Sequence, residues 1–356
     1  MQTIDSHIEK LSDAIHNWLQ PDNKHLRKAI ERSVDEGLFG LEDIKHRIRH
    51  LKQSVDSISL KKWCDKAGLV SPAEKDNVVC CLHAGNIPLV GFHDLLAVLL
   101  SGASYRGKLS RKDPYLMVSL LKILADFGLV SKNHWSTSLS QFRSMDADAV
   151  LFSGSASSVT PVRKLLKELG IASQETPELI RTAYYSIAWI TDNSKETMEE
   201  LTESVFRYGG NGCRSVAVVV APFGLNEEKC EFTDYVENFW LKNPQHQKPN
   251  PSLSYRFAYN KAVGIEQAWL NDFLIEENLS FPDEKFILQW IKGGRKEIEN
   301  LVQQSAGSLQ SVYSNSEMGR MIGGKAIEPL SLAQKPPVWW KADGVDTIEW
   351  LLKTLR

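Results

Sequence analysis

Cys213 is the residue best placed to do chemistry, because it lies on a loop rather than in a packed element. The loop spans residues 208–215, contains three glycines and one asparagine, and leads directly into the apolar run 216–220. Glycine lets the backbone adopt a positive φ and lets another group approach closely. A thiol on such a loop can attack an acyl carbonyl as the thiolate. The remaining cysteines lie in apolar or helical runs, which predicts buried structural roles for Cys64, Cys80, Cys81 and Cys230.

Asn86 is a second candidate, in a turn directly after the apolar run Val78–Leu82. Ligands of open α/β sheets gather at the carboxyl ends of the strands. An asparagine amide at such a place can donate a hydrogen bond to a developing oxyanion. The turn reads Gly-Asn-Ile-Pro, which is ordinary turn material, so the segment alone also fits a simple connection.

Cations follow the next predicted strand, at Lys108, Arg111 and Lys112, just before a helix. Lysine and arginine at a strand end can hold phosphate through charge-assisted hydrogen bonds. A solvated helix entry would have the same composition, so this cluster gains meaning only beside other phosphate-binding features.

Small residues follow a third predicted strand, at Ser153, Gly154 and Ser155. Small side chains let backbone N–H groups and a helix N-terminus come close to a phosphate. Serine is also a favoured helix N-cap, which is the structural alternative. The segment is not Gly-x-Gly-x-x-Gly, so the Rossmann fingerprint is not supported.

The composition argues against several classes of function. The chain has 356 residues with 42 basic and 44 acidic side chains, a net charge of −2 and no long basic block, so nucleic acid finds no electrostatic footprint. No apolar run reaches the ~18–20 residues of a membrane-spanning helix. The five cysteines lack CxxC spacing and the nine histidines are scattered, which predicts neither a disulfide framework nor a metal site. With no signal-peptide pattern at the N-terminus, we expect a reducing, cytoplasmic location.

Hydrophobic periodicity predicts helices first and alternating strands and helices afterwards. Residues 1–60 carry apolar stripes at helical spacing, interrupted at Pro21. After Pro72, strands are predicted at 78–82, up to 108, and at 149–152, 186–190, 216–220, 286–291 and 309–313. Helices are predicted at 92–100, 113–127, 162–169, 226–241, 258–271 and 343–355, with a loop at 243–251. This alternation is typical of a doubly wound α/β fold.

Taken in order, these motifs resemble the aldehyde dehydrogenase superfamily and, within it, the bacterial luminescence-type acyl-CoA reductases, the LuxC-like family. The resemblance runs from about residue 75 to the C-terminus. It rests on four matches: Asn86-Ile87-Pro88 to the oxyanion Asn-x-Pro motif, Lys108 to the lysine ending the next strand, Phe152–Ser155 to the Phe-Thr-Gly-Ser pyrophosphate turn, and Cys213 to the nucleophile of the Gly-x-x-Cys loop. Residues 342–347 are similar to the C-terminal segment of short acyl-CoA reductases.

The resemblance implies an aldehyde-dehydrogenase-like fold with two doubly wound parallel-sheet domains and an N-terminal helical segment. We expect residues 1–70 to pack on an NADP-binding Rossmann-like domain, 71–207. A catalytic domain, 208–330, would carry Cys213, and residues 331–356 would return to the domain interface. The implied cofactor residues are Lys108, Arg111, Ser153, Gly154 and Ser155.

Two departures from the superfamily pattern refine the expected chemistry. Hydrolytic members carry a Glu-Leu-Gly-Gly motif whose glutamate activates water, whereas the comparable stretch here, residues 181–185, has no carboxylate. This favours a reductase over an aldehyde oxidiser. NAD-preferring members place a glutamate three residues after the cofactor lysine, where this chain has Arg111. An arginine would pair with a 2′-phosphate, which predicts NADPH. The late Glu-x-Phe-Gly-Pro segment has no convincing match.

The expected function is therefore reduction of an acyl-CoA or acyl-carrier protein thioester to the aldehyde, with an acyl-Cys213 intermediate and Asn86 at the oxyanion. Two alternatives stay open: an acyltransferase that uses the same cysteine without hydride, and a non-catalytic scaffold subunit of a lipid or pigment synthesis complex. A cysteine protease fits least, because no histidine lies in a recognisable partner motif. A homodimer or a partner acyltransferase or synthetase is compatible with the resemblance.

Overall fold

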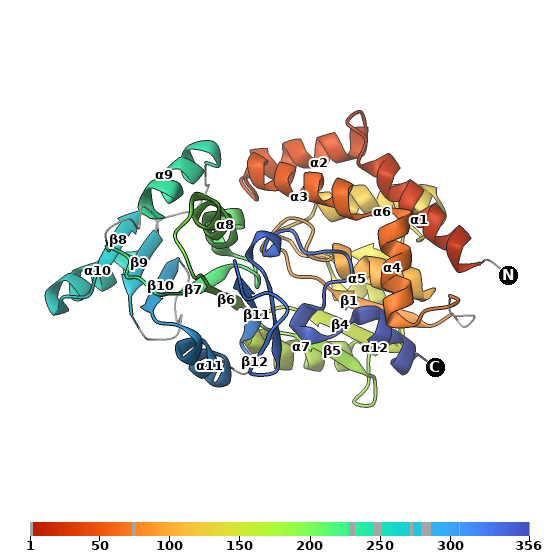
Figure 1. Ribbon diagram of the computed structural model, residues 1–356. Coiled ribbons are helices and arrows are strands. Elements are labelled where there is room, and N and C mark those ends of the chain that lie inside the picture. The colour runs from red at the N-terminus through yellow and green to blue at the C-terminus, as the bar shows by residue number, and fades with distance from the viewer. Residues whose placement is uncertain are drawn as a thin grey trace. The chain divides into compact units, whose positions relative to one another are not determined.

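The chain crosses twice between two units, each built around one β-sheet (Figure 1). The computed structural model describes residues 3–72, 76–227, 232–244, 251–270, 273–278, 286–305 and 307–355. Unit 1 comprises the described residues up to Thr182 and from Pro337 onward, and unit 2 comprises those of Ala183–Pro336. Each unit has its own hydrophobic core.

Unit 1 contains a five-stranded sheet, sheet A, in which every pair is parallel and the order is β3-β2-β1-β4-β5. Its strands are β1 (Val78–Leu82), β2 (Ser104–Lys108), β3 (Trp135–Ser136), β4 (Ala149–Ser153) and β5 (Glu178–Arg181). Successive side chains of a strand point to opposite faces of the sheet. Accordingly, Cys81 joins the core cluster on one face and Cys80 joins the cluster on the other.

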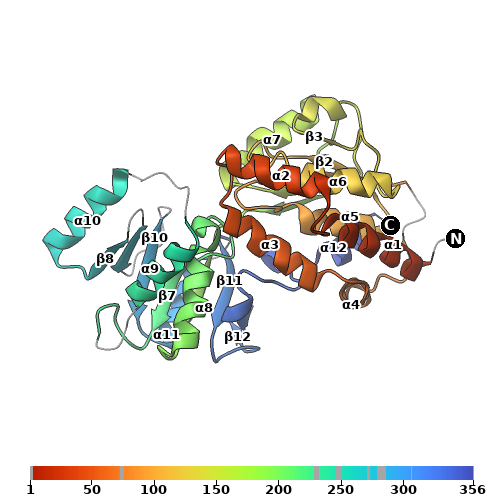
Figure 2. The same ribbon diagram turned by 90° about the horizontal axis from the view of Figure 1, so that it is seen from above.

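The helices of unit 1 cover both faces of sheet A (Figure 2). Helix α7 (Ala156–Glu168) packs on the Cys80 face. The Cys81 face is covered by α1 (Ile4–Trp18), α2 (Lys24–Asp35), α3 (Leu41–Ser54), α4 (Ser57–Ala67), α5 (Phe92–Ser101), α6 (Leu116–Asp126) and α12 (Thr347–Thr354). The 3₁₀ turns are Leu139–Phe142 and Ala342–Gly344. The apolar stripe from residue 41 to 58 is divided between α3 and α4, and Ile58 is 78% exposed rather than buried.

Unit 2 contains an eight-stranded sheet, sheet B, in the order β12-β13-β11-β6-β7-β10-β9-β8. Its strands are β6 (Tyr185–Trp189), β7 (Val216–Ala221), β8 (Gln267–Leu270), β9 (Phe273–Glu277), β10 (Ile287–Lys292), β11 (Leu309–Ser314), β12 (Met321–Ile322) and β13 (Lys325–Pro329). The central pairs are parallel, and the two outermost pairs, β8–β9 and β12–β13, are antiparallel.

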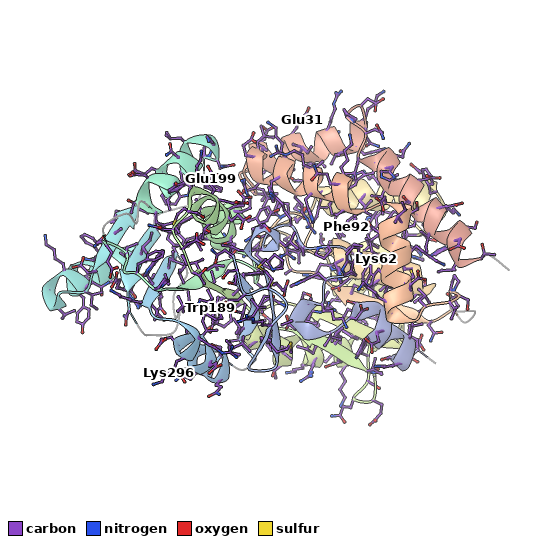
Figure 3. All side chains as sticks on the ribbon, viewed as in Figure 1. Glu31, Lys62, Phe92, Trp189, Glu199 and Lys296 are labelled. Atoms are coloured by element: carbon purple, nitrogen blue, oxygen red, sulfur yellow. The ribbon has the colours of Figure 1, made fainter. Side chains whose placement is uncertain are left out.

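Alternation within the strands of sheet B also divides the core of unit 2. Val219 packs with helices α8 (Lys195–Phe206) and α9 (Phe232–Lys242), whereas Val218 and Val220 pack with α11 (Arg295–Gln304) on the opposite face. The remaining elements are helix α10 (Pro251–Val263) and the 3₁₀ turns Arg207–Gly210 and Leu330–Leu332. Figure 3 labels Glu199 of α8 and Lys296 of α11, which are both exposed.

Several boundaries differ from those expected from the sequence. The chain leaves unit 1 after Thr182 rather than after residue 207, because β6 pairs with β7 and β11 of sheet B. The helix predicted at 258–271 was wrong in its second half, since Gln267–Leu270 forms β8 against β9. In the segment predicted as helix at 226–241, the helix begins at Phe232, and residues 228–231 lie outside the described part. Helix α10 already starts at Pro251, at the end of the predicted loop, and residues 245–250 are not described.

Candidate functional site

The strand order of sheet A brings the carboxyl ends of β1 and β4 together at the point where the order of the strands reverses. Strands β2 and β3 lie on one side of β1, and β4 and β5 lie on the other. Ligands of doubly wound sheets bind at such a switch point, outside the carboxyl ends of the strands. The Asn86 turn follows β1 and the Ser153–Ser155 turn follows β4, so both leave the sheet at this position.

Lys108 lies at the same level of the sheet, at the end of β2. Leu82 of β1 pairs with Lys108 on one side and with Phe152 on the other, so the Cα atoms of Lys108 and Phe152 are two strand spacings, about 10 Å, apart. Burial, followed by the positive charge of Arg111, lowers the pKa of Lys108. The two cations are therefore close enough to repel one another, and an anion between them would relieve that repulsion.

The turn after β4 combines a closely packed glycine with a helix start that lacks a side-chain cap. A Cβ atom at Gly154 would lie 2.6 Å from the ring of Phe152, so a larger residue would not fit without a shift. Ser155 is the N-cap of α7, but its side chain makes no capping hydrogen bond, and its hydroxyl lies instead 3.0 and 2.6 Å from those of Ser157 and Ser158. The first-turn N–H groups of α7 are thus without a side-chain cap, as a phosphate-binding helix start requires.

The loop carrying Asn86 packs tightly against the loop carrying Arg111. Asn86 is exposed at the tip of its turn. The backbone of Gly85 approaches Ser110 so closely that a Cβ atom would lie 2.4 Å from the Ser110 hydroxyl oxygen. Asp113 fastens the same two loops, because its carboxylate accepts hydrogen bonds from the N–H of Leu89 at 2.9 Å and from the start of α6. Burial raises the pKa of Asp113 to about 6.

A buried histidine–tyrosine pair supports the base of the Asn86 loop. His83 Nε2 lies 2.7 Å from the hydroxyl of Tyr105, and the two rings stack with centroids 5.9 Å apart. Glycines make room for both rings, since a Cβ atom at Gly91 would meet the His83 ring and one at Gly107 would meet the Tyr105 hydroxyl. Burial lowers the pKa of His83 to about 4. His83 is therefore neutral at pH 7 and has a structural role.

The Cys213 loop has an unusual backbone. Three consecutive residues, Tyr208, Gly209 and Gly210, adopt φ angles of 58, 62 and 69°. Tyr208 is a buried non-glycine residue in this region, which is a costly conformation that the surroundings must enforce. A Cβ atom at Gly210 would also lie 3.2 Å from the carbonyl oxygen of Val205, so glycine suits this position for two reasons.

Hydrogen bonds fix Cys213 at the amino end of β7. The hydroxyl of Ser186, at the start of β6, donates to the carbonyl oxygen of Cys213 at 3.0 Å. Ser215 closes the turn, because its N–H donates to Gly212 O and its hydroxyl accepts from Gly212 N–H. The Arg214 side chain donates to the carbonyl of Ala333 at 3.1 Å. The cysteine thus lies on a turn with a defined backbone geometry.

The accessibility of Cys213 distinguishes it from the other described cysteines. Cys213 is partly exposed, whereas Cys64, Cys80 and Cys81 are buried as predicted. Burial raises the pKa of Cys64 to about 11 and that of Cys80 to about 12, so these thiols are inert. Cys230 lies outside the described residues.

The structure brings five of the seven candidate residues to one edge of sheet A and a sixth to the loop beside it. Lys108 lies at the end of β2 and the Ser153–Ser155 turn lies at the end of β4, and these two strands flank β1. Asn86 follows β1, and Arg111 follows Lys108. Cys213 belongs to unit 2 and lies at the amino end of its strand. The contacts of Gly85, Ser110 and Asp113 were not foreseen, because each is a contact between loops far apart in sequence.

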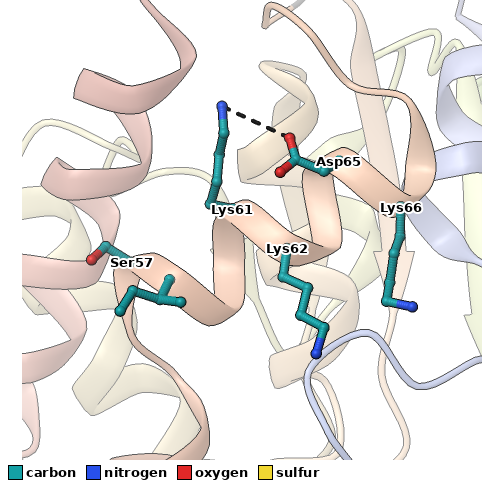
Figure 4. Close-up of a pocket in the computed structure, with 6 residues that line it drawn as sticks. Ser57, Lys61, Lys62, Asp65 and Lys66 are labelled. Carbon is teal, nitrogen blue, oxygen red and sulfur yellow. Dashed lines mark ion pairs between the residues drawn. The ribbon is translucent and has the colours of Figure 1, made fainter.

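The pocket shown in Figure 4 has a different character. Its volume is about 470 Å³, and it is lined by one helix, α4, through residues 57, 58, 61, 62, 65 and 66. Lys61 lies 2.8 Å from Asp5 and 3.8 Å from Asp65, so its charge is already compensated.

Among the described residues no group of three or more His, Cys, Asp or Glu side chains is arranged to hold a metal ion. Every helix in the described ranges of the chain is too short or too polar to cross a bilayer.

No model of a protein family and no curated protein matches the sequence. Solved structures do match it. A variant of proline utilization A from Bradyrhizobium japonicum has a TM-score of 0.61 and 15% identity, covering 92% of this chain and 40% of the other. Aldehyde dehydrogenase 21 from Physcomitrella patens has a TM-score of 0.58 and 11% identity, covering 86% and 72%. The NAD-dependent aldehyde dehydrogenase from Sinorhizobium meliloti has a TM-score of 0.61 and 10% identity, covering 88% and 70%.

These neighbours define the class of fold. The protein has an aldehyde-dehydrogenase-like α/β fold, as the motif order predicted. Sheet A is parallel as expected, whereas sheet B is mixed, because its outermost pairs β8–β9 and β12–β13 are antiparallel. The chain spans less than half of the length of the proline utilization A chains and about seven tenths of that of the aldehyde dehydrogenases. At 10–16% identity the likeness extends to the fold alone.

Proposed function

We propose that the protein reduces an acyl thioester, carried by coenzyme A or an acyl-carrier protein, to the aldehyde, with NADPH as the reductant and Cys213 as the acyl acceptor. The observation that carries the proposal is the placement of Cys213: a partly exposed thiol on a glycine turn with positive φ angles, in an aldehyde-dehydrogenase-like fold. The resemblance to LuxC-like acyl-CoA reductases supplies the substrate class.

The carboxyl edge of sheet A fits a phosphate-bearing cofactor. Lys108 and the uncapped start of α7 would hold the pyrophosphate, with Ser153, Gly154 and Ser155 forming the turn. Arg111, exposed and within electrostatic range of Lys108, would pair with the 2′-phosphate of NADPH. When bound, NADPH supplies a hydride to the acyl carbon and leaves as NADP⁺.

In the proposed reaction Cys213 carries the covalent steps. Its thiolate forms a bond to the thioester carbonyl carbon, and the carrier thiolate leaves and takes up a proton. The Asn86 amide and the backbone N–H of Cys213 stabilise the oxyanion. After hydride delivery, the carbon–sulfur bond of the thiohemiacetal breaks, which releases the aldehyde and restores the thiolate. One thioester is reduced for each NADPH oxidised.

The stretch that would hold a water-activating base supports reduction rather than hydrolysis. Residues 181–185 contain no carboxylate. The side chain of Arg181 is bound to Asp94 and Thr347, and the hydroxyl of Tyr185 donates to Ser305 at 2.7 Å. Because this stretch offers no base for water, an acyl group on Cys213 is left to the reductant.

Acyl-CoAs of different chain length, incubated with the protein with and without NADPH, test the proposal. Intact-protein mass spectrometry measures the acyl adduct, and the absorbance of NADPH measures reduction. Cys213→Ala should abolish the adduct and lower aldehyde formation by a factor on the order of 10⁴ or more, whereas the control Cys64→Ala should retain both. Aldehyde formation by Cys213→Ala at the native rate would overturn the proposal. An adduct that forms and transfers without NADPH oxidation would indicate an acyltransferase, and neither signal would indicate a scaffold.

A further inference from the structure

Arg181, at the end of β5, is buried inside unit 1 and is bonded through both terminal nitrogens of its guanidinium group, whereas its Nε has no hydrogen-bond partner among the described residues. Its side chain is 6% exposed. One guanidinium nitrogen donates to the carboxylate of Asp94 at 2.5 Å, and another donates to the hydroxyl of Thr347 at 2.7 Å. Asp94 lies in the first turn of α5, and Thr347 is the first residue of α12. Burial opposes ionisation of Asp94, but the charge of Arg181, together with the hydrogen bond and charge of His93 and the charge of His83, outweighs it and holds the pKa of Asp94 below its usual range.

The same contacts extend around the start of α12. Asp346 is the N-cap of this helix and accepts a hydrogen bond from the indole N–H of Trp63 at 3.2 Å. The Trp63 ring lies 4.6 Å from the ring of His93, and His93 precedes Asp94 in α5. Side chains from α4, α5, β5 and the start of α12 are thereby linked by hydrogen bonds and one aromatic contact.

A buried ion pair of this kind is poor evidence for stability alone. Removing two charges from water costs several kcal/mol, and well-packed apolar side chains of similar volume often serve equally well. A buried arginine with fixed partners does, however, define the position of its own backbone. The question is therefore which neighbouring group uses the backbone of Arg181.

The backbone of Arg181 holds the turn that follows β4. Ser153 pairs with Arg181 as the last residue pair between β4 and β5. The N–H of Gly154 donates to the carbonyl oxygen of Arg181 at 3.2 Å, so the turn begins on this residue. The next residue is fixed as well, because the N–H of Thr182 donates to the carboxylate of Asp343 at 3.2 Å.

We propose that Arg181 is a positioning residue: held by Asp94 and Thr347, it sets the geometry of the Ser153–Ser155 turn and thereby the turn's affinity for a dinucleotide pyrophosphate. The C-terminal helix α12 thus contributes to the cofactor site without touching it, through Thr347. The identity of the ligand rests on the proposed function, whereas the effect on the turn does not.

Hydrogen–deuterium exchange of the full chain without ligand tests the positioning directly. Thr347→Val removes one hydrogen bond to a charged group and keeps the volume, and Arg181→Met removes the guanidinium. Thr347→Val should speed exchange in peptides covering 153–158 about tenfold, with little change in α5, whereas Arg181→Met should speed exchange in both segments because it also leaves the buried Asp94 without its ion-pair partner. Arg163→Met is the matched control, because Arg163 is an exposed arginine of the same unit that pairs with Glu178. Unchanged exchange at 153–158 in Thr347→Val, or equal acceleration throughout unit 1, would overturn the inference.

Calorimetric titration of the same variants with NADPH measures the effect of each substitution on NADPH affinity. Thr347→Val should bind NADPH several-fold more weakly, and Arg163→Met should bind it as the native protein does. Faster exchange at the turn with native NADPH affinity would refute the link to affinity. If the native protein binds no NADPH, the proposed function fails, while the exchange measurement still decides whether Arg181 positions the turn.

Discussion

Gly85→Ala tests whether the Asn86 loop and the Arg111 loop form one packed assembly. A Cβ atom at this position would lie 2.4 Å from Ser110 Oγ, 2.5 Å from Ser110 Cβ and 3.2 Å from the Asp113 backbone nitrogen. The φ of Gly85 is outside the left-handed region, so alanine adds no backbone strain and the effect comes from these contacts. At least one of the two loops must move to admit the methyl group.

The size of the effect follows from two opposing contributions. Overpacking a tight contact destabilises a protein by about 1–3 kcal/mol. Replacing glycine by alanine where the backbone allows it stabilises by about 0.4–1 kcal/mol, because the unfolded chain loses freedom. We therefore expect Gly85→Ala to lower the free energy of unfolding by about 1–2 kcal/mol.

Ser110→Gly provides the matched partner variant. It removes the two atoms that the new methyl group would meet, and the nearest remaining atom is the Asp113 nitrogen at 3.2 Å. It also removes the hydrogen bond from the N–H of Lys112 to the Ser110 hydroxyl, at 3.1 Å, which alone costs about 1 kcal/mol. The double variant should therefore be little worse than Ser110→Gly, with a favourable coupling of about 1–2 kcal/mol.

Urea-induced unfolding of the four proteins in this cycle measures the coupling. Because the chain is divided into two compact units, each resolved transition is fitted on its own, and we expect only a transition of unit 1 to respond. Changes that add within about 0.5 kcal/mol would show that the two loops do not share the contact, and the close packing inferred for the site would be wrong.

Two further predictions concern charge. Arg111→Glu should weaken NADPH binding about tenfold or more while leaving NADH binding nearly unchanged, because the charge-assisted contact to the 2′-phosphate is lost; equal losses for both nucleotides in calorimetric titration would contradict this role. His83, with its pKa lowered to about 4 by burial, binds its proton more weakly in the folded than in the unfolded chain. The contribution of this pKa shift to the free energy of unfolding is complete above pH ~6.5 and decreases by about 3 kcal/mol as the pH falls to 4. His83→Gln should therefore make the free energy of unfolding fall less steeply between these pH values. Burial raises the pKa of Asp113 to about 6, so Asp113 changes stability with pH in the opposite direction. If the free energy of unfolding of His83→Gln falls with pH as steeply as that of the native protein, the role given to His83 is refuted.

The strands of the central sheets could be predicted because they are buried on both faces. Val78–Leu82 and Val216–Ala221 are short runs of apolar residues, and the structure assigns both to the interior of a parallel sheet. Such runs leave no ambiguity about which face is covered. The order of strands and helices then indicated the doubly wound architecture.

The errors arose where pairing between distant segments decides the structure. Gln267–Leu270 was assigned to a helix, yet it forms an edge strand because β9 offers it a hydrogen-bonding partner. Likewise, β6 was placed with the first domain, although its partners β7 and β11 belong to sheet B. Local propensity contains no information about either partner.

The candidate site, too, could be predicted where local sequence decides the structure and could not be predicted where contacts between distant segments decide it. The type and context of Cys213 predicted an accessible thiol, and Lys108 with the turn at Ser153 predicted an assembly at one sheet edge. The tight contact of Gly85 with Ser110 and the bonds of Arg181 to Asp94 and Thr347 had no signal in the sequence, because each joins residues that only the fold brings together.

The contacts found only in the structure change how the turn of residues 153–155 should be understood. Its own residues provide small side chains and an uncapped helix start, which any phosphate could use. Its position depends on Arg181, and the position of Arg181 depends on the first residue of the last helix, Thr347. A substitution at Thr347 should therefore change nucleotide affinity, although the residue is fully buried and part of a different element. From the motif of the turn alone, a substitution at Thr347 would be expected to change only the packing of the core.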